Sequence, residues 1–160
     1  MPVLADKARQ FHALHEAGRP LLLPNAWDVA SARVIADAGA AAIATTSAGV
    51  AWSLGFGDGG HLDRQRALQV IARIAAAVEV PVTADIEGGF ADEPVPVNVL
   101  IGPGTLPVPA LAKAGAARIS AGSSIAEAAY GLAARAAREL LADGTAQALA
   151  GAWTTPHSTR

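Results

Sequence analysis

The sequence has no cysteine, few aromatic residues and no long apolar run, and each shortage excludes a class of protein. Without cysteine there is no disulfide framework, no thiolate metal site and no cysteine nucleophile. No stretch approaches the ~20 uninterrupted apolar residues of a membrane-spanning helix, because charged residues or proline interrupt every candidate. The first ten residues lack the basic and then apolar layout of a signal peptide, so a cytoplasmic location is expected.

Charge and composition argue against two further classes of binding partner, nucleic acids and membranes. The 12 basic and 14 acidic residues give a net charge of −2 and do not cluster, which argues against a nucleic-acid partner. The chain is 52% hydrophobic, but 40 of its 160 residues are alanine, which accounts for most of the positive mean hydropathy of +0.33. The larger apolar residues are an ordinary supply for one core, so we expect a single domain over 1–160 and no membrane partner.

Short apolar segments alternate along the chain with alanine-rich segments of helical periodicity. Strands are predicted over 21–24, 41–45, 81–84, 97–101 and 118–121. Helices are predicted over 5–17, 28–38, 63–78, 107–114 and 124–142, and 47–60 is predicted to be a glycine-rich loop. This alternation indicates βαβ units and a parallel sheet covered on both faces. The motif Ala38-Gly39-Ala40 recurs as Ala114-Gly115-Ala116, which favours a barrel-type repeat.

Two acidic residues, Asp85 and Glu87, follow the third predicted strand at its carboxyl end. Because side chains alternate along a strand, both point to the same side, and that end is where α/β active sites lie. Two carboxylates at one mouth suit a hard divalent ion such as Mg²⁺, held partly through water. The alternative is that one acid caps a helix and the other is solvated, and these residues alone do not decide between the two.

Three glycine-rich or small-residue segments are further candidates. The segment 45–49 follows a strand, and its backbone amides could bind a carboxylate, although a plain turn explains it equally well. The segment 55–60 matches G-x-G-x-x-G but lies about nine residues beyond its strand, so we reject a dinucleotide site and retain Asp58 as a candidate. The loops 102–105 and 122–124 follow the last two strands, where barrels often bind phosphate; turn chemistry is the alternative.

Several separated motifs follow one familiar order. They are Leu21-Leu22-Leu23-Pro24-Asn25-Ala26-Trp27-Asp28, 45–52, Ser53-Leu54-Gly55 with Asp58, 80–89, Pro96-Val97-Asn98-Val99-Leu100, Gly102-Pro103-Gly104-Thr105 and Arg118-Ile119-Ser120. This order resembles the isocitrate lyase/phosphoenolpyruvate mutase superfamily in its short-chain bacterial branch, over nearly the whole chain.

The resemblance implies an α/β fold derived from the (β/α)₈ TIM barrel, with Mg²⁺, or Mn²⁺ in its place, at the carboxyl end of the strands. It also implies a lyase or phosphonomutase that acts on a 2-oxo acid or an isocitrate-like carboxylate through an enolate intermediate. No residue can be assigned as catalytic. The matching positions are Ser47, Ala48 and Gly49 for the family's substrate-binding turn, and Asp58, Asp85 and Glu87 for its metal-site acids.

The chain is shorter than the barrel that it resembles, with 160 residues against ~250 in a typical (β/α)₈ barrel. Family strands four to six have no counterpart here, and the join falls near 90–96. The retained strands predict a partial barrel of about five parallel strands, in the barrel order seven, eight, one, two and three. Its two outer edges, at Val82 and Val99, predict pairing with another chain as a homo-oligomer. Three functions stay open: an enzyme of this family, a non-catalytic fragment that serves as an oligomerising scaffold, and, ranked last, a phosphate-binding barrel enzyme that uses the loops 102–105 and 122–124.

Overall fold

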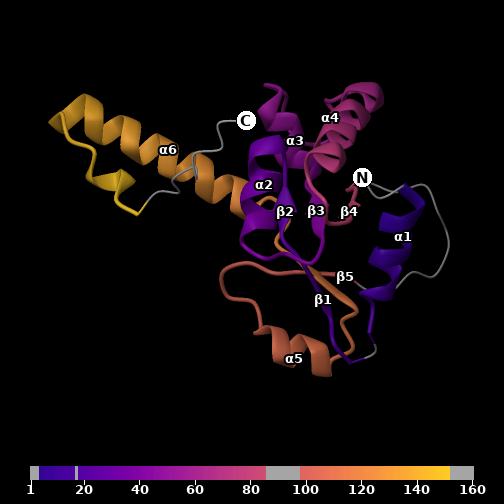
Figure 1. The fold of residues 1–160 in the computed structure, drawn as a ribbon. Helices are drawn as coiled ribbons and strands as arrows, with labels where there is room; N and C mark the ends of the chain where they lie inside the picture. The colour runs from indigo at the N-terminus through magenta and orange to yellow at the C-terminus, as the bar shows by residue number, and fades with distance from the viewer. Residues whose placement is uncertain (1–3, 17, 86–97, 152–160) are drawn as a thin grey trace. The chain divides into compact units, whose positions relative to one another are not determined.

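Helices and strands alternate in the computed structural model, which describes residues 4–16, 18–85 and 98–151 (Figure 1). In chain order they are α1 (Leu4–Ala13), β1 (Leu21–Leu23), β2 (Asn25–Ala26), α2 (Val29–Asp37), β3 (Ile43–Thr45), α3 (Ser47–Ser53), α4 (Arg64–Ala77), β4 (Val82–Thr83), β5 (Asn98–Leu100), α5 (Val108–Lys113), β6 (Arg118–Ser120), α6 (Ser124–Asp143) and the 3₁₀ helix η1 (Gln147–Leu149). The chain divides into two units, Met1–Ala126 and Glu127–Arg160, and all the described strands belong to the first.

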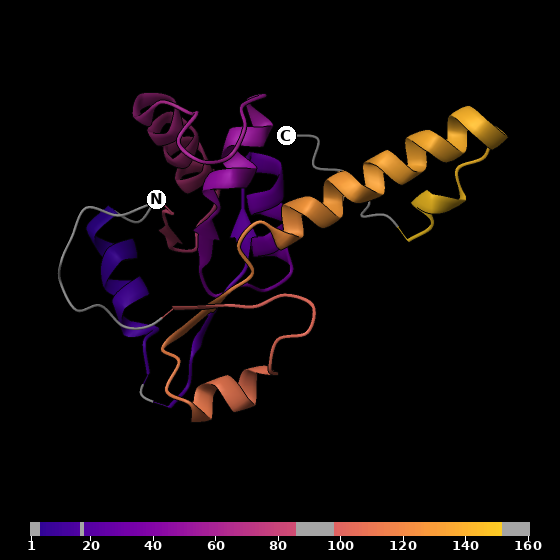
Figure 2. The ribbon, with the colours of Figure 1, turned by 180° about the vertical axis from the view of Figure 1, so that it is seen from behind.

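The described strands form two three-stranded parallel sheets, β1-β6-β5 and β2-β3-β4 (Figures 1 and 2). β1 and β2 are consecutive parts of one segment, separated by Pro24, so the sheets continue into each other as β5-β6-β1/β2-β3-β4. Pro24 ends the pairing of this segment with β6, because proline has no N–H group to donate. This is the predicted order of five barrel strands, and within the described residues it is open rather than closed into a barrel.

Opposite faces of the strands are covered by different helices, as the alternation of helices and strands predicts. On one face Ile43 of β3 packs against α2, α3 and α4, in a buried cluster that also contains Ala26, Ala32, Ile35, Val50, Val70, Ile74 and Val78. On the other face Leu21 and Leu23 pack with Ala42 and Ala44, against the half-buried side chains of Phe11 and Leu14. The core of the first unit therefore has two layers of side chains, one on each side of the sheet.

Helix starts and ends follow local sequence signals. Asp28 caps α2, accepting a hydrogen bond from the backbone N–H of Ser31 at 2.7 Å, and the Ser31 hydroxyl oxygen accepts one from the Asp28 N–H at 3.1 Å. Asp63 caps α4 by accepting a hydrogen bond from the N–H of Arg66 at 3.0 Å. Both caps fix the point at which the chain leaves the loop and enters a helix that covers the sheet.

The repeated Ala-Gly-Ala motif has the same structure in both places. Gly39 after α2 and Gly115 after α5 each have a φ of 93°, a conformation that favours glycine. The amide that follows each glycine donates back to the carbonyl five residues earlier, closing the helix end. The sequence echo is therefore a repeated helix-to-strand turn.

The prediction of a loop over 47–60 was wrong for its first half, because Ser47–Ser53 forms the helix α3. Four of its residues, Ala48, Gly49, Val50 and Ala51, are buried. A helix this short is stabilised little by local propensity and depends on tertiary packing. The glycine and serine content of the segment, from which the loop was predicted, gives no information on that packing.

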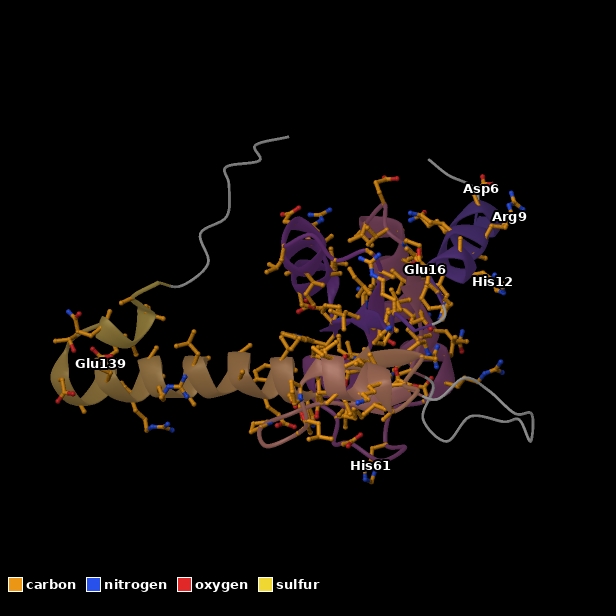
Figure 3. The ribbon with its side chains drawn as sticks, turned by 90° about the horizontal axis from the view of Figure 1, so that it is seen from below. Asp6, Arg9, His12, Glu16, His61 and Glu139 are labelled. Carbon is orange, nitrogen blue, oxygen red and sulfur yellow. The ribbon has the colours of Figure 1, made fainter. Side chains whose placement is uncertain are left out.

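The second unit contains most of α6 and the turn η1. Among the described residues, no helix is both long enough and apolar enough to cross a membrane. Glu139 lies towards the far end of α6 (Figure 3), and its carboxylate accepts hydrogen bonds from the Thr145 hydroxyl and from the backbone N–H groups of Gln147 (2.6 Å) and Ala148 (2.7 Å). These bonds, that of Thr145 first, lower the pKa of Glu139.

We expect the turn from Thr145 to Ala148 to open on acidification. A carboxyl group whose pKa is lowered by folding stabilises the folded form above its unfolded pKa, and this contribution is lost as the pH falls through the folded pKa. The loss should therefore begin in the range in which a free glutamate titrates and be complete only below the lowered pKa of the folded form. Amide hydrogen exchange at Gln147 and Ala148, corrected for intrinsic rates, should speed up at acid pH, and Glu139→Gln should remove that pH dependence. Protection of these two amides that stays constant down to strongly acid pH contradicts the expectation.

Candidate functional site

Polar groups from neighbouring strands meet at the carboxyl end of β3 and β4. Ser47 is the first residue of α3 and follows β3 by two residues, and Asp85 follows β4 by two residues. The backbone N–H and the hydroxyl of Ser47 both donate to Asp85 Oδ2, each at 3.2 Å. The backbone N–H of Asp85 in turn donates to Thr45 Oγ1 at 2.8 Å. The structure thus brings together one residue of the predicted substrate-binding turn and one predicted metal-site acid.

Asn25, which sequence reasoning did not select, connects this group to the loop that follows β6, on the other side of the β1/β2 segment. It is the first residue of β2 and is only 4% exposed. Its Nδ2 donates to the Thr45 carbonyl at 2.9 Å, and its Oδ1 accepts from the N–H groups of Ala121 and Gly122, both at 2.9 Å. The available signal was an asparagine inside an otherwise apolar strand, because a buried amide needs partners for both its donor and its acceptor.

The other two residues of the predicted turn are buried. Ala48 is 6% exposed, and Gly49 lies so close to its neighbours that an added Cβ would stand 2.8 Å from both Thr46 Cγ2 and Trp27 Cβ. Half-buried Ser47 is therefore the residue of the turn whose side chain and N–H face the Asp85 carboxylate.

The remaining predicted metal-site acids do not join this group within the described part of the chain. Asp58 is exposed, and its Oδ1 accepts a hydrogen bond from the N–H of Gly59 at 2.8 Å, within its own loop. Glu87, like the predicted join near 90–96, lies outside the described residues. In the described ranges no three His, Asp or Glu side chains lie close enough together to hold a metal ion. Asp58 and Glu87 as metal ligands stay predictions.

The donors present at Asp85 nevertheless suit magnesium. The carboxylate of Asp85 and the hydroxyl of Ser47 are hard oxygen donors 3.2 Å apart, and Asp85 is exposed. Proteins commonly bind Mg²⁺ through one or two carboxylates, with waters and substrate oxygens completing the octahedron. The residues present therefore fit an ion that a substrate helps to hold.

The two loops predicted as an alternative phosphate site also lie together. The Thr105 hydroxyl donates to the Gly102 carbonyl at 2.8 Å, and a Cβ on Gly102 would stand 3.7 Å from Ser124 Oγ. The hydrogen bond of Thr105 closes a turn within its own loop, as expected for the alternative in which this loop is an ordinary turn.

Comparisons of the sequence with known proteins identify its relatives. The family model described as phosphoenolpyruvate phosphomutase matches residues 11–95. Uncharacterized proteins of two Mycobacterium tuberculosis strains, CDC 1551 and H37Rv, are each 46% identical to this chain over 88 residues. That match covers 52% of this chain and 32% of each relative, so the aligned part spans about a third of the relatives' length.

Two solved structures from Burkholderia cenocepacia J2315 share the fold. A proposed lyase/mutase has a TM-score of 0.84 and 26% identity, covering 95% of this chain and 94% of its own. A proposed phosphonomutase has a TM-score of 0.74 and 24% identity, covering 83% of this chain and 99% of its own, which shows the fold alone. The α/β arrangement described above is therefore that of the lyase/mutase fold. Because the family model matches more than half of its residues, the chain belongs to the phosphoenolpyruvate phosphomutase family.

Proposed function

We propose that the protein is a Mg²⁺-dependent lyase or phosphonomutase, acting on a 2-oxo acid or an isocitrate-like carboxylate through an enolate intermediate. In this proposal Asp85 holds the ion and Ser47 binds the substrate carboxylate, with Mn²⁺ as a substitute for Mg²⁺. The observation that carries it is the contact between these two residues, at the carboxyl ends of adjacent parallel strands in a lyase/mutase fold.

The residues themselves supply binding and orientation. Bound Mg²⁺ would neutralise the negative charge that develops on the enolate oxygen. The N–H and hydroxyl of Ser47 are two donors that can bind a carboxylate, and both contacts to Asp85 are at the long end of the hydrogen-bond range, so they are readily exchanged. The Thr45 hydroxyl oxygen, by accepting from the Asp85 N–H, keeps the backbone that carries the carboxylate in place.

Calorimetric titration with Mg²⁺ tests the proposal. Wild-type protein should give a saturable heat of binding, and Asp85→Asn should weaken the affinity at least about tenfold, because one of very few carboxylate ligands is lost. Asp37→Asn, which makes the same change at the exposed end of α2, should leave the affinity unchanged. Loaded protein should then turn over oxaloacetate, an isocitrate-like acid or phosphoenolpyruvate. If Asp85→Asn and Asp37→Asn bind Mg²⁺ equally well, Asp85 is not the ligand.

One observation favours a second function, an oligomerising scaffold without catalysis. Among the described strands β4 and β5 each pair along one side, which leaves two edges able to pair with another copy. Beside β4 lies a cavity of about 780 Å³, with apolar lining from Phe11, Leu68, Ile71 and Val82. The scaffold is the better description if the titration gives no metal-dependent heat while light scattering finds a dimer.

A further inference from the structure

We propose that Asn25 is a positioning residue for this site: its buried amide joins the end of β3 to the loop after β6 and so fixes where Asp85 stands. The inference rests on the proposed function, because it concerns the affinity for Mg²⁺.

The strand pairing leaves a gap that the Asn25 side chain fills. β1 pairs with β6 as far as Leu23 and Ser120, while β2 pairs with β3 on its other side. Just beyond the last paired residue of β6, the N–H groups of Ala121 and Gly122 both donate to Asn25 Oδ1 at 2.9 Å. At the point where the two sheets separate, the Asn25 side chain therefore accepts the hydrogen bonds that a paired strand would otherwise accept through its backbone.

Asparagine is suited to this position because it offers a donor and an acceptor on one short side chain. The acceptor is used by two amides of the loop after β6, and the donor by the Thr45 carbonyl on β3. At 4% exposure, water is not at hand to replace a lost partner, so each unmade bond carries the full desolvation cost of a buried polar group. An aspartate keeps the acceptor but turns a second oxygen towards the Thr45 carbonyl.

Thr45 passes this restraint on to Asp85. The ladder between β3 and β4 ends at the pair Ala44 and Thr83, so the backbone of Asp85 lies beyond it. There the N–H of Asp85 donates to the Thr45 hydroxyl oxygen at 2.8 Å, while the carbonyl of the same threonine accepts from Asn25. Asn25 and Asp85 thus hold opposite sides of one residue, and a shift of Thr45 displaces the carboxylate proposed to bind the ion.

The first test is the Mg²⁺ affinity of Asn25→Asp, measured by calorimetry. The proposal expects a loss of about tenfold or more, as is typical when a group that orients a metal ligand is removed. The added negative charge would by itself tighten cation binding, so a loss cannot be an effect of charge. The matched control is Asn98→Asp on β5, whose exposed side chain donates only to Ser120 Oγ at 3.0 Å in the described contacts, and whose affinity should not fall. Equal or tighter binding by Asn25→Asp overturns the proposal.

A second measurement uses the wild-type protein and does not depend on the variant folding. Saturation with Mg²⁺ should slow amide hydrogen exchange severalfold at Ala121 and Gly122, as well as at Ser47 and Asp85. Protection confined to Ser47 and Asp85 shows a metal site without the Asn25 connection and overturns the inference alone. If wild-type protein shows no Mg²⁺ binding, the proposed function fails first, and with it the reason to assign Asn25 this role.

Discussion

Replacing Ile43 by alanine is expected to lower the free energy of unfolding by about 2–5 kcal/mol. Ile43 lies at the start of β3, is 0% exposed and belongs to the cluster between the sheet and the helices α2, α3 and α4. The change deletes buried carbon atoms and leaves a cavity, because the strand is held on both sides by β2 and β4 and cannot collapse inwards. For a domain whose total stability is ~5–15 kcal/mol, this is a large fraction.

Urea denaturation followed by circular dichroism measures the effect, with Leu22→Ala as the control. Leu22 lies on β1 of the same unit and loses a comparable number of carbon atoms, but its side chain is 50% exposed. Because half of the transfer free energy is already forgone in the folded state and no closed cavity forms, we expect a loss below about 1.5 kcal/mol. Similar losses in both variants would mean that β3 does not form the centre of the core.

Elements that depend on neighbouring residues were predictable from the sequence. The caps at Asp28 and Asp63 and the turns at Gly39 and Gly115 involve partners within five residues, and each lies at or next to a predicted bound of the helix that it begins or ends. The strand order was predictable through the resemblance to a barrel family, because the parallel strands of a barrel can lose one contiguous block and keep the pairing of the rest. Local chemistry and topology thus sufficed for most of the fold.

The site was only partly predictable, because some of the residues that contact each other there lie far apart in the sequence. Ser47 and Asp85 were each predicted to follow the carboxyl end of a parallel strand, and the structure shows in addition that they contact each other. The partners of Asn25 lie 96 and 97 residues away on the chain, at Ala121 and Gly122, and no local pattern indicates which amides a buried asparagine will meet. Asp58 bonds to its own loop instead, a contact that its glycine-rich neighbourhood makes easy.

The close packing around Gly49 was likewise not predictable from the sequence, and substitution of this residue is expected to have the second large effect on stability. Gly49→Ala is expected to destabilise the protein by about 1–3 kcal/mol, the usual cost of overpacking a core. A Cβ at this position would stand 2.8 Å from Thr46 Cγ2 and from Trp27 Cβ, and 3.4 Å from Ala126 Cβ. The two shorter distances are below van der Waals contact, and two of the three atoms are Cβ atoms fixed to backbone, so the first turn of α3 has to move away.

The matched control is Gly131→Ala, the same change at another helical glycine. There the nearest atom to a new Cβ is Arg135 Nη1 at 3.5 Å, an ordinary contact at the end of a flexible side chain. Alanine should therefore stabilise helix α6 by up to about 1 kcal/mol. Urea denaturation should place the two variants on opposite sides of wild type. Two stabilised variants would contradict the close packing of α3 on Trp27.

The packing at Gly49 also bears on the site, because Ser47 begins the same turn of α3. When that turn moves, the two donors of Ser47 move away from Asp85 Oδ2, and their present distances of 3.2 Å leave little room before the hydrogen bonds are lost. Amide exchange at Ser47 should therefore speed up in Gly49→Ala even where the protein is fully folded, and stay unchanged in Gly131→Ala. The glycine that the sequence indicated as part of a binding turn would then act through its missing side chain, by letting α3 approach the sheet closely enough for Ser47 to reach Asp85.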